Sequence, residues 1–150
     1  MSGRDPYHAG LVGADFYAAK RDVSGELAVV LQGKLDNRGL ELIEPISRAV
    51  NRGEIHELIL TDDPEATPGR RVDRIAYLGF FEVVQPGVIL AGDEFFVDER
   101  PVGHLAGFDS THLPNHLNVV IRVAERLDGV ERGAAPGSRI RFTHSRSNRG

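Results

Sequence analysis

The chain has 150 residues, 18 basic and 22 acidic side chains, a formal net charge of −4, and no cysteine. This length and a hydrophobic content of 41% are typical of one globular domain with a single core, so we expect residues 1–150 to form one domain. The absence of cysteine excludes a disulfide framework, a thiolate zinc site, an iron–sulfur cluster and a cysteine nucleophile. The mild acidity, without a basic block in the body of the chain, argues against a nucleic-acid partner.

The chain ends and the hydropathy pattern indicate where the protein resides. No apolar run approaches the roughly 18 residues of a membrane-spanning helix, and the first ten residues lack the apolar stretch of a signal peptide. We therefore expect a cytoplasmic protein without a membrane partner. Residues 1–24 lack a clear pattern, which predicts a poorly defined N-terminal segment, and the polar, basic residues 144–150 predict a frayed tail.

The first half of the chain predicts a strand, a helix and a second strand. The compact apolar run at residues 26–31 is typical of a buried strand, and residues 57–61 form another before a polar loop at 62–69. Between them, residues 38–51 have apolar positions at three- and four-residue intervals, which predicts an amphipathic helix: Leu40, Ile43, Ile46, Ala49 and Val50. Pro45 would either kink this helix or open its second part, and Gly53 would end it.

The second half predicts short strands separated by turn residues. The apolar segments lie at residues 72–84, 88–90, 94–97, 102–108, 117–123 and 139–143. Regular spacing of this kind favours a small antiparallel β-barrel or a strongly bent sheet. Together with the one or two helices of the first half, the sequence predicts an α+β fold, with residues 72–123 as one continuous run of antiparallel strands.

Half of the six histidines lie between positions 104 and 116, in a window that also contains Asp109. The ends of this window are apolar and β-branched, while Pro114 argues against a regular helix through its centre. The polar side chains are therefore expected on a loop between two strands, where functional residues are common.

The residue types in this window suggest two kinds of chemistry. Asp109, His112 and His116, with His104 as a fourth ligand, could bind a divalent Zn, Fe, Mn or Ni ion that polarises a substrate or activates water. Without a metal, His112 or His116 could act as a base oriented by Asp109. The remaining alternative is that these residues only stabilise the loop. In either functional case we expect the side chains of Asp109, His112 and His116 to converge on one point.

Other polar residues are candidates for substrate binding. Arg70, Arg71 and Arg74 could hold an anionic substrate group by bidentate contacts if they face the histidine loop, although a solvated turn with an Asp–Arg pair is the more common explanation of such a cluster. Tyr77, which could also be a core residue, and the amides of Asn115 and Asn118 complete the predicted substrate contacts.

Three segments resemble those of an uncharacterised bacterial family of unknown function. They are GEIHEL at 53–58, RVDRIAYLGFFE at 71–82 and GFDSTHLPNHLN at 107–118, the last following a GFDxTHxPNHxN motif. Some members of that family are encoded beside natural-product pathways, so the resemblance implies a dedicated small-molecule role in metabolism or biosynthesis. It implies no particular catalytic residue.

The sequence leaves two functional classes open. The first is a small-molecule enzyme in which the His/Asp site supports lyase, hydrolase or isomerase chemistry, with metal assistance as the first expectation. The second is a non-catalytic barrel that binds a metabolite or a protein partner. A homodimer is compatible with either class, because open barrels leave strand edges exposed.

Overall fold

The structure is a computed structural model that describes residues 16–145, and this part of the chain is built from β-strands without an α-helix. The strands are β1 (Val23–Val30), β2 (Lys34–Leu35), β3 (Leu40–Glu41), β4 (Ser47–Val50), β5 (Ile55–Thr61), β6 (Arg71–Val72), β7 (Ile75–Gln85), β8 (Gly87–Leu90), β9 (Glu94–Val97), β10 (Arg100–Asp109), β11 (Asn118–Val123) and β12 (Arg139–Thr143).

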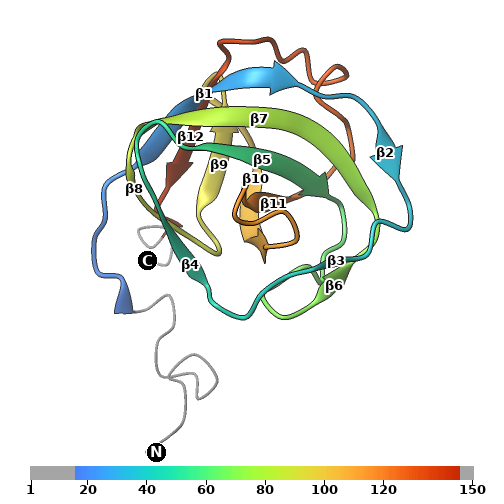
Figure 1. Cartoon of the computed structure of the whole chain (residues 1–150), viewed down its shortest axis with the longest axis horizontal. Coiled ribbons are helices and arrows are strands. Elements are labelled where there is room, and N and C mark those ends of the chain that lie inside the picture. Colours follow the sequence, from blue (N-terminus) through green and yellow to red (C-terminus); the bar gives the residue numbers. More distant parts are fainter. Residues whose placement is uncertain (1–15, 146–150) are drawn as a thin grey trace, which may run out of the picture.

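Seven strands close into a barrel in the order β1-β12-β9-β10-β11-β5-β7, because β7 pairs back to β1 (Figure 1). Every neighbouring pair is antiparallel except β5 and β11, which run parallel. The short strands β3 and β6 form one separate pair, and β4 and β8 form another. Closure leaves the barrel strands with partners on both sides, so the barrel has no free sheet edge.

Two apolar cores stabilise this arrangement. The first fills the barrel interior and contains its largest side chains: Phe81, Phe95, Phe108 and Phe142. The second lies on the outer face, where Leu40, Leu42 and Val72 cover residues of the barrel strands such as Ile59 and Val120. The outer faces of β5 and β11 are therefore buried as well, which is why both strands consist of nearly continuous buried residues.

The close contact between β1 and β7 depends on Gly79. A Cβ atom at this position would overlap the Val29 carbonyl oxygen, so no side chain is tolerated there. The pairing of the two strands shifts register between Leu27 and Val29, next to this glycine. Gly79 therefore allows the long strand β7 to approach β1 and close the barrel.

The predicted α+β fold is wrong, because no helix forms at residues 38–51. This segment contains β3 and β4 with irregular backbone between them. Its backbone N–H groups bond to distant carbonyls, as in Leu42 N to Arg70 O at 3.0 Å and Ile43 N to Phe108 O at 2.8 Å. Leu40 and Leu42 enter the outer core whereas Val50 enters the barrel core, so residues with helical spacing serve two different cores.

The predicted positions of the strands are confirmed, whereas their predicted pairing is wrong in part. Each apolar segment predicted as a strand contains one, and the described residues have no helix between 88 and 123. The continuous antiparallel run across 72–123 is wrong, because β6 and β8 pair with β3 and β4, and β11 runs parallel to β5. Strands β1 and β5 each pair with β7, and no helix lies between them among the described residues. The strand–helix–strand unit expected in the first half of the chain is therefore also wrong.

Both ends of the described chain are attached to the barrel at Asp93, a residue with 1% exposure. Lys20 Nζ lies 2.7 Å from Asp93 Oδ2, and His144 Nδ1 lies 3.8 Å from Asp93 Oδ1. The other ring nitrogen of His144 contacts the Tyr17 carbonyl at 2.8 Å. Burial raises the pKa of Asp93, while the Lys20 ammonium acts in the opposite direction. The predictions for residues 1–15 and 146–150 lie outside the described residues.

Candidate functional site

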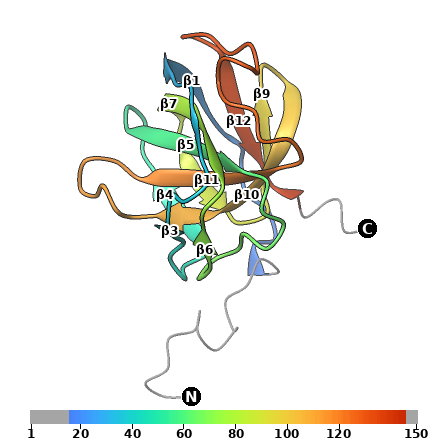
Figure 2. The ribbon, with the colours of Figure 1, turned by 90° about the vertical axis from the view of Figure 1, so that its right-hand side faces the viewer.

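The histidine loop, residues 110–117, connects β10 to β11 and projects from the barrel (Figure 2). His112 O accepts hydrogen bonds from Asn115 N at 2.8 Å and from His116 N at 3.2 Å, so the backbone makes a single turn across Pro114. This turn places the rings of His112 and His116 side by side, with centroids 5.0 Å apart. The expected loop is confirmed, and the turn within it brings the two imidazoles together.

His116 faces a carboxylate on the barrel wall. Its Nε2 atom lies 3.3 Å from Glu57 Oε1, and both side chains are largely buried, with 13% and 9% exposure. The Asn115 amide lies 3.0 Å from His116 Nδ1 and can donate to it; the neutral ring then carries its proton on Nε2, toward Glu57. The approach is too oblique for a hydrogen bond, so Nε2 is a buried nitrogen without a hydrogen-bond partner.

Glu57 is a desolvated acid. Burial raises its pKa, while the nearby His116, His112 and Arg38 act in the opposite direction. The net effect is a raised pKa, because these neighbours compensate the loss of hydration only in part. A carboxyl group with this property beside an imidazole is typical of sites that transfer protons.

Three further side chains surround this pair. The Phe80 ring meets the edge of the His116 ring with centroids 5.1 Å apart. Arg38 donates from Nε to the Tyr77 hydroxyl at 3.2 Å, and its charge acts on Glu57. The site therefore combines an exposed imidazole, a buried acid, a guanidinium and an aromatic wall.

Asp109 has a different environment, although it lies in the same row of the sheet. Asp109, Asn118, Glu57 and Phe80 are paired in register across β10, β11, β5 and β7, so their side chains lie on the same face. The Asp109 carboxylate accepts from Glu41 N at 3.0 Å, Thr111 N at 2.9 Å and Asn118 Nδ2 at 3.2 Å. Burial acts to raise its pKa, but these hydrogen bonds outweigh that effect and hold the pKa below its usual range.

The predicted metal ligands do not assemble in the part of the chain that the structure describes. No three His, Asp or Glu side chains gather there in a way that could hold a metal ion. The Asp109 oxygens turn to the backbone of Glu41 and Thr111 instead of the two imidazoles. His104 is exposed on β10, paired in register with Arg122 and Glu94. The structure therefore brings His112 and His116 together, and leaves Asp109 and His104 with other neighbours.

The predicted arginine cluster forms surface ion pairs. Arg74 makes a two-pronged contact with Asp62, at 3.2 and 3.1 Å, and Arg71 Nε lies 3.1 Å from Asp73. Arg70 is also exposed and lies 3.9 Å from Glu65. These guanidinium groups already have carboxylate partners, so the alternative of a solvated turn describes them better than a substrate anchor.

Sequence reasoning did not identify Glu57 or Arg38 as site residues. Glu57 stands in an apolar run that correctly predicts a strand, and a carboxylate inside such a run is itself a signal of a buried acid. Nothing in the local sequence connects it to His116, because the parallel pairing of β5 and β11 makes that connection. Of the other predicted substrate contacts, Asn115 orients His116 and Asn118 bonds to Asp109.

A model of a protein family of unknown function, DUF6917, matches residues 17–143. The chain belongs to this family. The match confirms the expectation that the chain comes from a family of unknown function, and it covers every barrel strand and the histidine loop. No curated protein and no solved structure matches the chain. The described residues contain no helix with the length and apolar character needed to cross a membrane.

Proposed function

We propose that this family member is a small-molecule enzyme that transfers protons at the cluster of His112, His116 and Glu57. The observation that carries the proposal is the buried pair of Glu57 Oε1 and His116 Nε2, 3.3 Å apart, directly beside the exposed imidazole of His112. A small-molecule substrate fits the role in metabolism or biosynthesis that the resemblance to this family implies.

The arrangement suggests roles for His112, Glu57 and Arg38. His112 is the exposed member and takes a proton from a carbon next to a substrate carbonyl group. The positive charge that forms on its ring is stabilised by the Glu57 carboxylate, which already interacts with His112. Returning the proton to another atom of the same substrate completes an isomerisation without loss or gain of atoms. Arg38 supplies a positive charge for the oxygen that becomes negative.

A purely structural role explains this cluster less well. The Asp109 carboxylate accepts three hydrogen bonds, whereas the neighbours of Glu57 include two buried atoms without any hydrogen-bond partner, His116 Nε2 and Asn118 Oδ1. Such groups reduce stability by about 1–3 kcal/mol each. Their presence around an acid with a raised pKa is typical of a site selected for chemistry.

Hydrogen–deuterium exchange tests the proposal. A panel of small ketones and keto acids is incubated with the protein in D₂O, and loss of the C–H signal beside the carbonyl is followed by ¹H NMR. We expect exchange with wild-type protein and a loss of about 100-fold or more in H112Q, because a positioned base contributes about 10²–10⁴-fold.

The matched control is H104Q, which removes an exposed histidine from β10 outside the cluster. It should exchange at the wild-type rate. Equal rates for wild type and H112Q with every compound would contradict the enzymatic proposal. They would favour the alternative, a non-catalytic barrel that binds a metabolite or a protein partner.

A further inference from the structure

A second candidate site lies at the tip of the β9–β10 hairpin. A pocket of about 210 Å³ is lined by Val97, Arg100, Pro101, Val102, Leu127 and Arg132. The last two come from the segment after β11, which folds against the hairpin. None of the residues of the histidine cluster lines this pocket, so it is a separate feature of the barrel.

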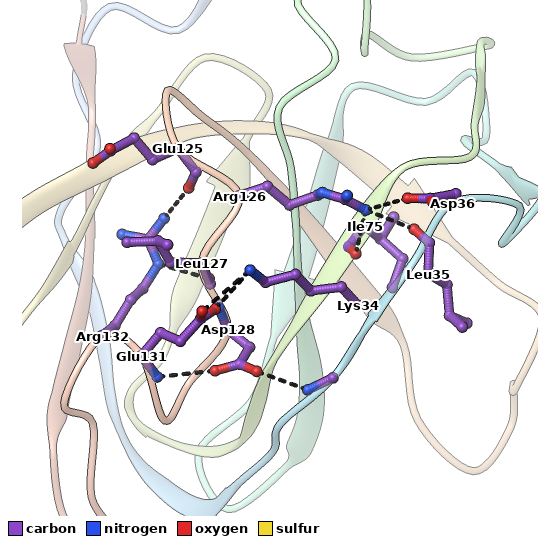
Figure 3. A network of polar contacts seen from close by, with 11 residues as sticks. Lys34, Leu35, Asp36, Ile75, Glu125, Arg126, Leu127, Asp128, Glu131 and Arg132 are labelled. Atoms are coloured by element: carbon purple, nitrogen blue, oxygen red, sulfur yellow. Dashed lines mark hydrogen bonds and ion pairs between the residues drawn. The ribbon is translucent and has the colours of Figure 1, made fainter.

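The segment that carries Arg132 is held by a network of polar contacts (Figure 3). Arg132 donates from Nε to Leu127 O at 3.0 Å and from Nη2 to Glu125 O. Asp128 accepts from Gly33 N at 2.8 Å, which attaches the segment to the connection between β1 and β2. These contacts fix the Arg132 guanidinium before any ligand arrives, which lowers the entropic cost of binding.

The positive charge in this pocket is not compensated by a bonded carboxylate. Arg132 interacts with Glu125 and Glu131 only through space, and burial lowers its pKa. Arg100 has no ion-pair partner among residues 16–145. By contrast, the two arginines of the pocket beside residues 62–64, Arg71 and Arg74, are paired with Asp73 and Asp62.

The other lining side chains are apolar. Val97, Pro101, Val102 and Leu127 form the rest of the wall. Among the described residues neither guanidinium group has an ion-pair partner, which favours an anion as the ligand. The N–H groups that Arg132 does not donate to Leu127 and Glu125, and those of Arg100, remain for a carboxylate. Apolar walls favour a ligand that has a hydrophobic body beside its charge.

We propose that this pocket binds a small organic carboxylate, with its charged end between Arg100 and Arg132 and its apolar body against Leu127. The site is independent of the proton-transfer proposal. An acidic metabolite bound here would be recognised by charge at one end and by shape at the other.

Benzoate is the test probe, because it combines a carboxylate with a compact apolar ring. Binding is measured by chemical-shift titration of the ¹⁵N-labelled full chain, with benzamide as the neutral compound of the same shape and inorganic phosphate as an anion without an apolar body. We expect saturable benzoate shifts at Arg100 and Leu127, and weak or absent binding of benzamide and phosphate.

The decisive variant is R100Q, since Arg100 is exposed and removing its charge leaves the fold intact. Its benzoate Kd should rise about tenfold or more, as expected for the loss of a charged hydrogen bond. R132K keeps the charge but loses the planar fork and should also weaken binding, whereas R52Q, in an exposed turn, should bind as wild type does. H112Q should bind benzoate normally.

Three results would overturn the proposal. The first is the absence of saturable benzoate shifts in wild-type protein. The second is equal affinity in R100Q and R52Q, and the third is binding of benzamide or phosphate as tight as that of benzoate. Because H112Q affects only the first site, failure here is distinguishable from failure of the proton-transfer proposal.

Discussion

Asp109 and Glu57 are buried carboxylates in one row of the sheet, separated only by β11, yet their pKa values move in opposite directions. Asp109 accepts three N–H groups, two of them from the backbone, and its pKa falls. Glu57 is desolvated and compensated only in part by the charges around it, so its pKa rises. The donors around a buried acid, more than its burial, therefore decide in which direction its pKa moves.

The largest expected effect on stability comes from substituting Asp109, the acid of this pair that accepts three hydrogen bonds. In D109N an amide replaces the carboxylate, and its NH₂ group faces backbone donors that then lose their acceptor. We expect the free energy of unfolding at pH 7 to fall by about 1–3 kcal/mol, measured by urea denaturation. E26Q, an exposed acid on β1, is the control, and equal stability of D109N and E26Q would contradict the assigned role.

The pH dependence of that loss has a definite sign. The folded-state pKa of Asp109 is lowered from 3.8, so its stabilising contribution is present above that value and is lost as the pH falls through the folded-state pKa. The difference in unfolding free energy between wild type and D109N should therefore be constant near neutral pH and shrink below about pH 4. A difference that grows on acidification would contradict the lowered pKa.

Glu57 should behave in the opposite way. Its folded-state pKa is raised from 4.5, so the folded state holds a proton more tightly and ionisation reduces stability as the pH rises through that value. E57Q should therefore be more stable than wild type at pH 7, by on the order of 1 kcal/mol, while losing exchange activity. Thermal unfolding at pH 7 and pH 4 measures this gain, which should disappear at the lower pH. Destabilisation by E57Q at pH 7 would make Glu57 a structural residue like Asp109.

The smallest effect is expected at the surface ion pairs. R74Q removes the contact to Asp62, where Arg74 is exposed and screened by solvent. Its melting temperature and its rate of exchange should match those of wild type. Loss of hydrogen–deuterium exchange in the substrate with R74Q would indicate instead that Arg74 binds the substrate.

Local sequence patterns predicted the strands but could not predict their partners. Apolar runs and turn residues mark segments such as 94–97 and 139–143, because those signals are local. The helix expected at 38–51 is wrong because spacings of three and four residues also occur when residues of one segment serve two cores, as Leu40 and Val50 do. Barrel closure through β7 depends on contacts between distant segments, which single-sequence periodicity does not encode.

The same distinction applies to the candidate site. His112 and His116 were found because they share one loop, and Asp109 was chosen as their partner because it is near in sequence. The carboxylate that faces His116 is Glu57, 59 positions earlier in the chain. Only the parallel pairing of β5 with β11 brings the two side chains together.

The most direct test of this account is the pKa of the Glu57 side chain, measured by ¹³C NMR titration of its carboxyl carbon in wild type, H116Q and H104Q. We expect a wild-type value above 4.5, a higher value in H116Q because the largest compensating charge is removed, and no change in H104Q. A wild-type value at or below 4.5, or a value that H116Q leaves unchanged, would contradict a desolvated acid coupled to the histidine loop.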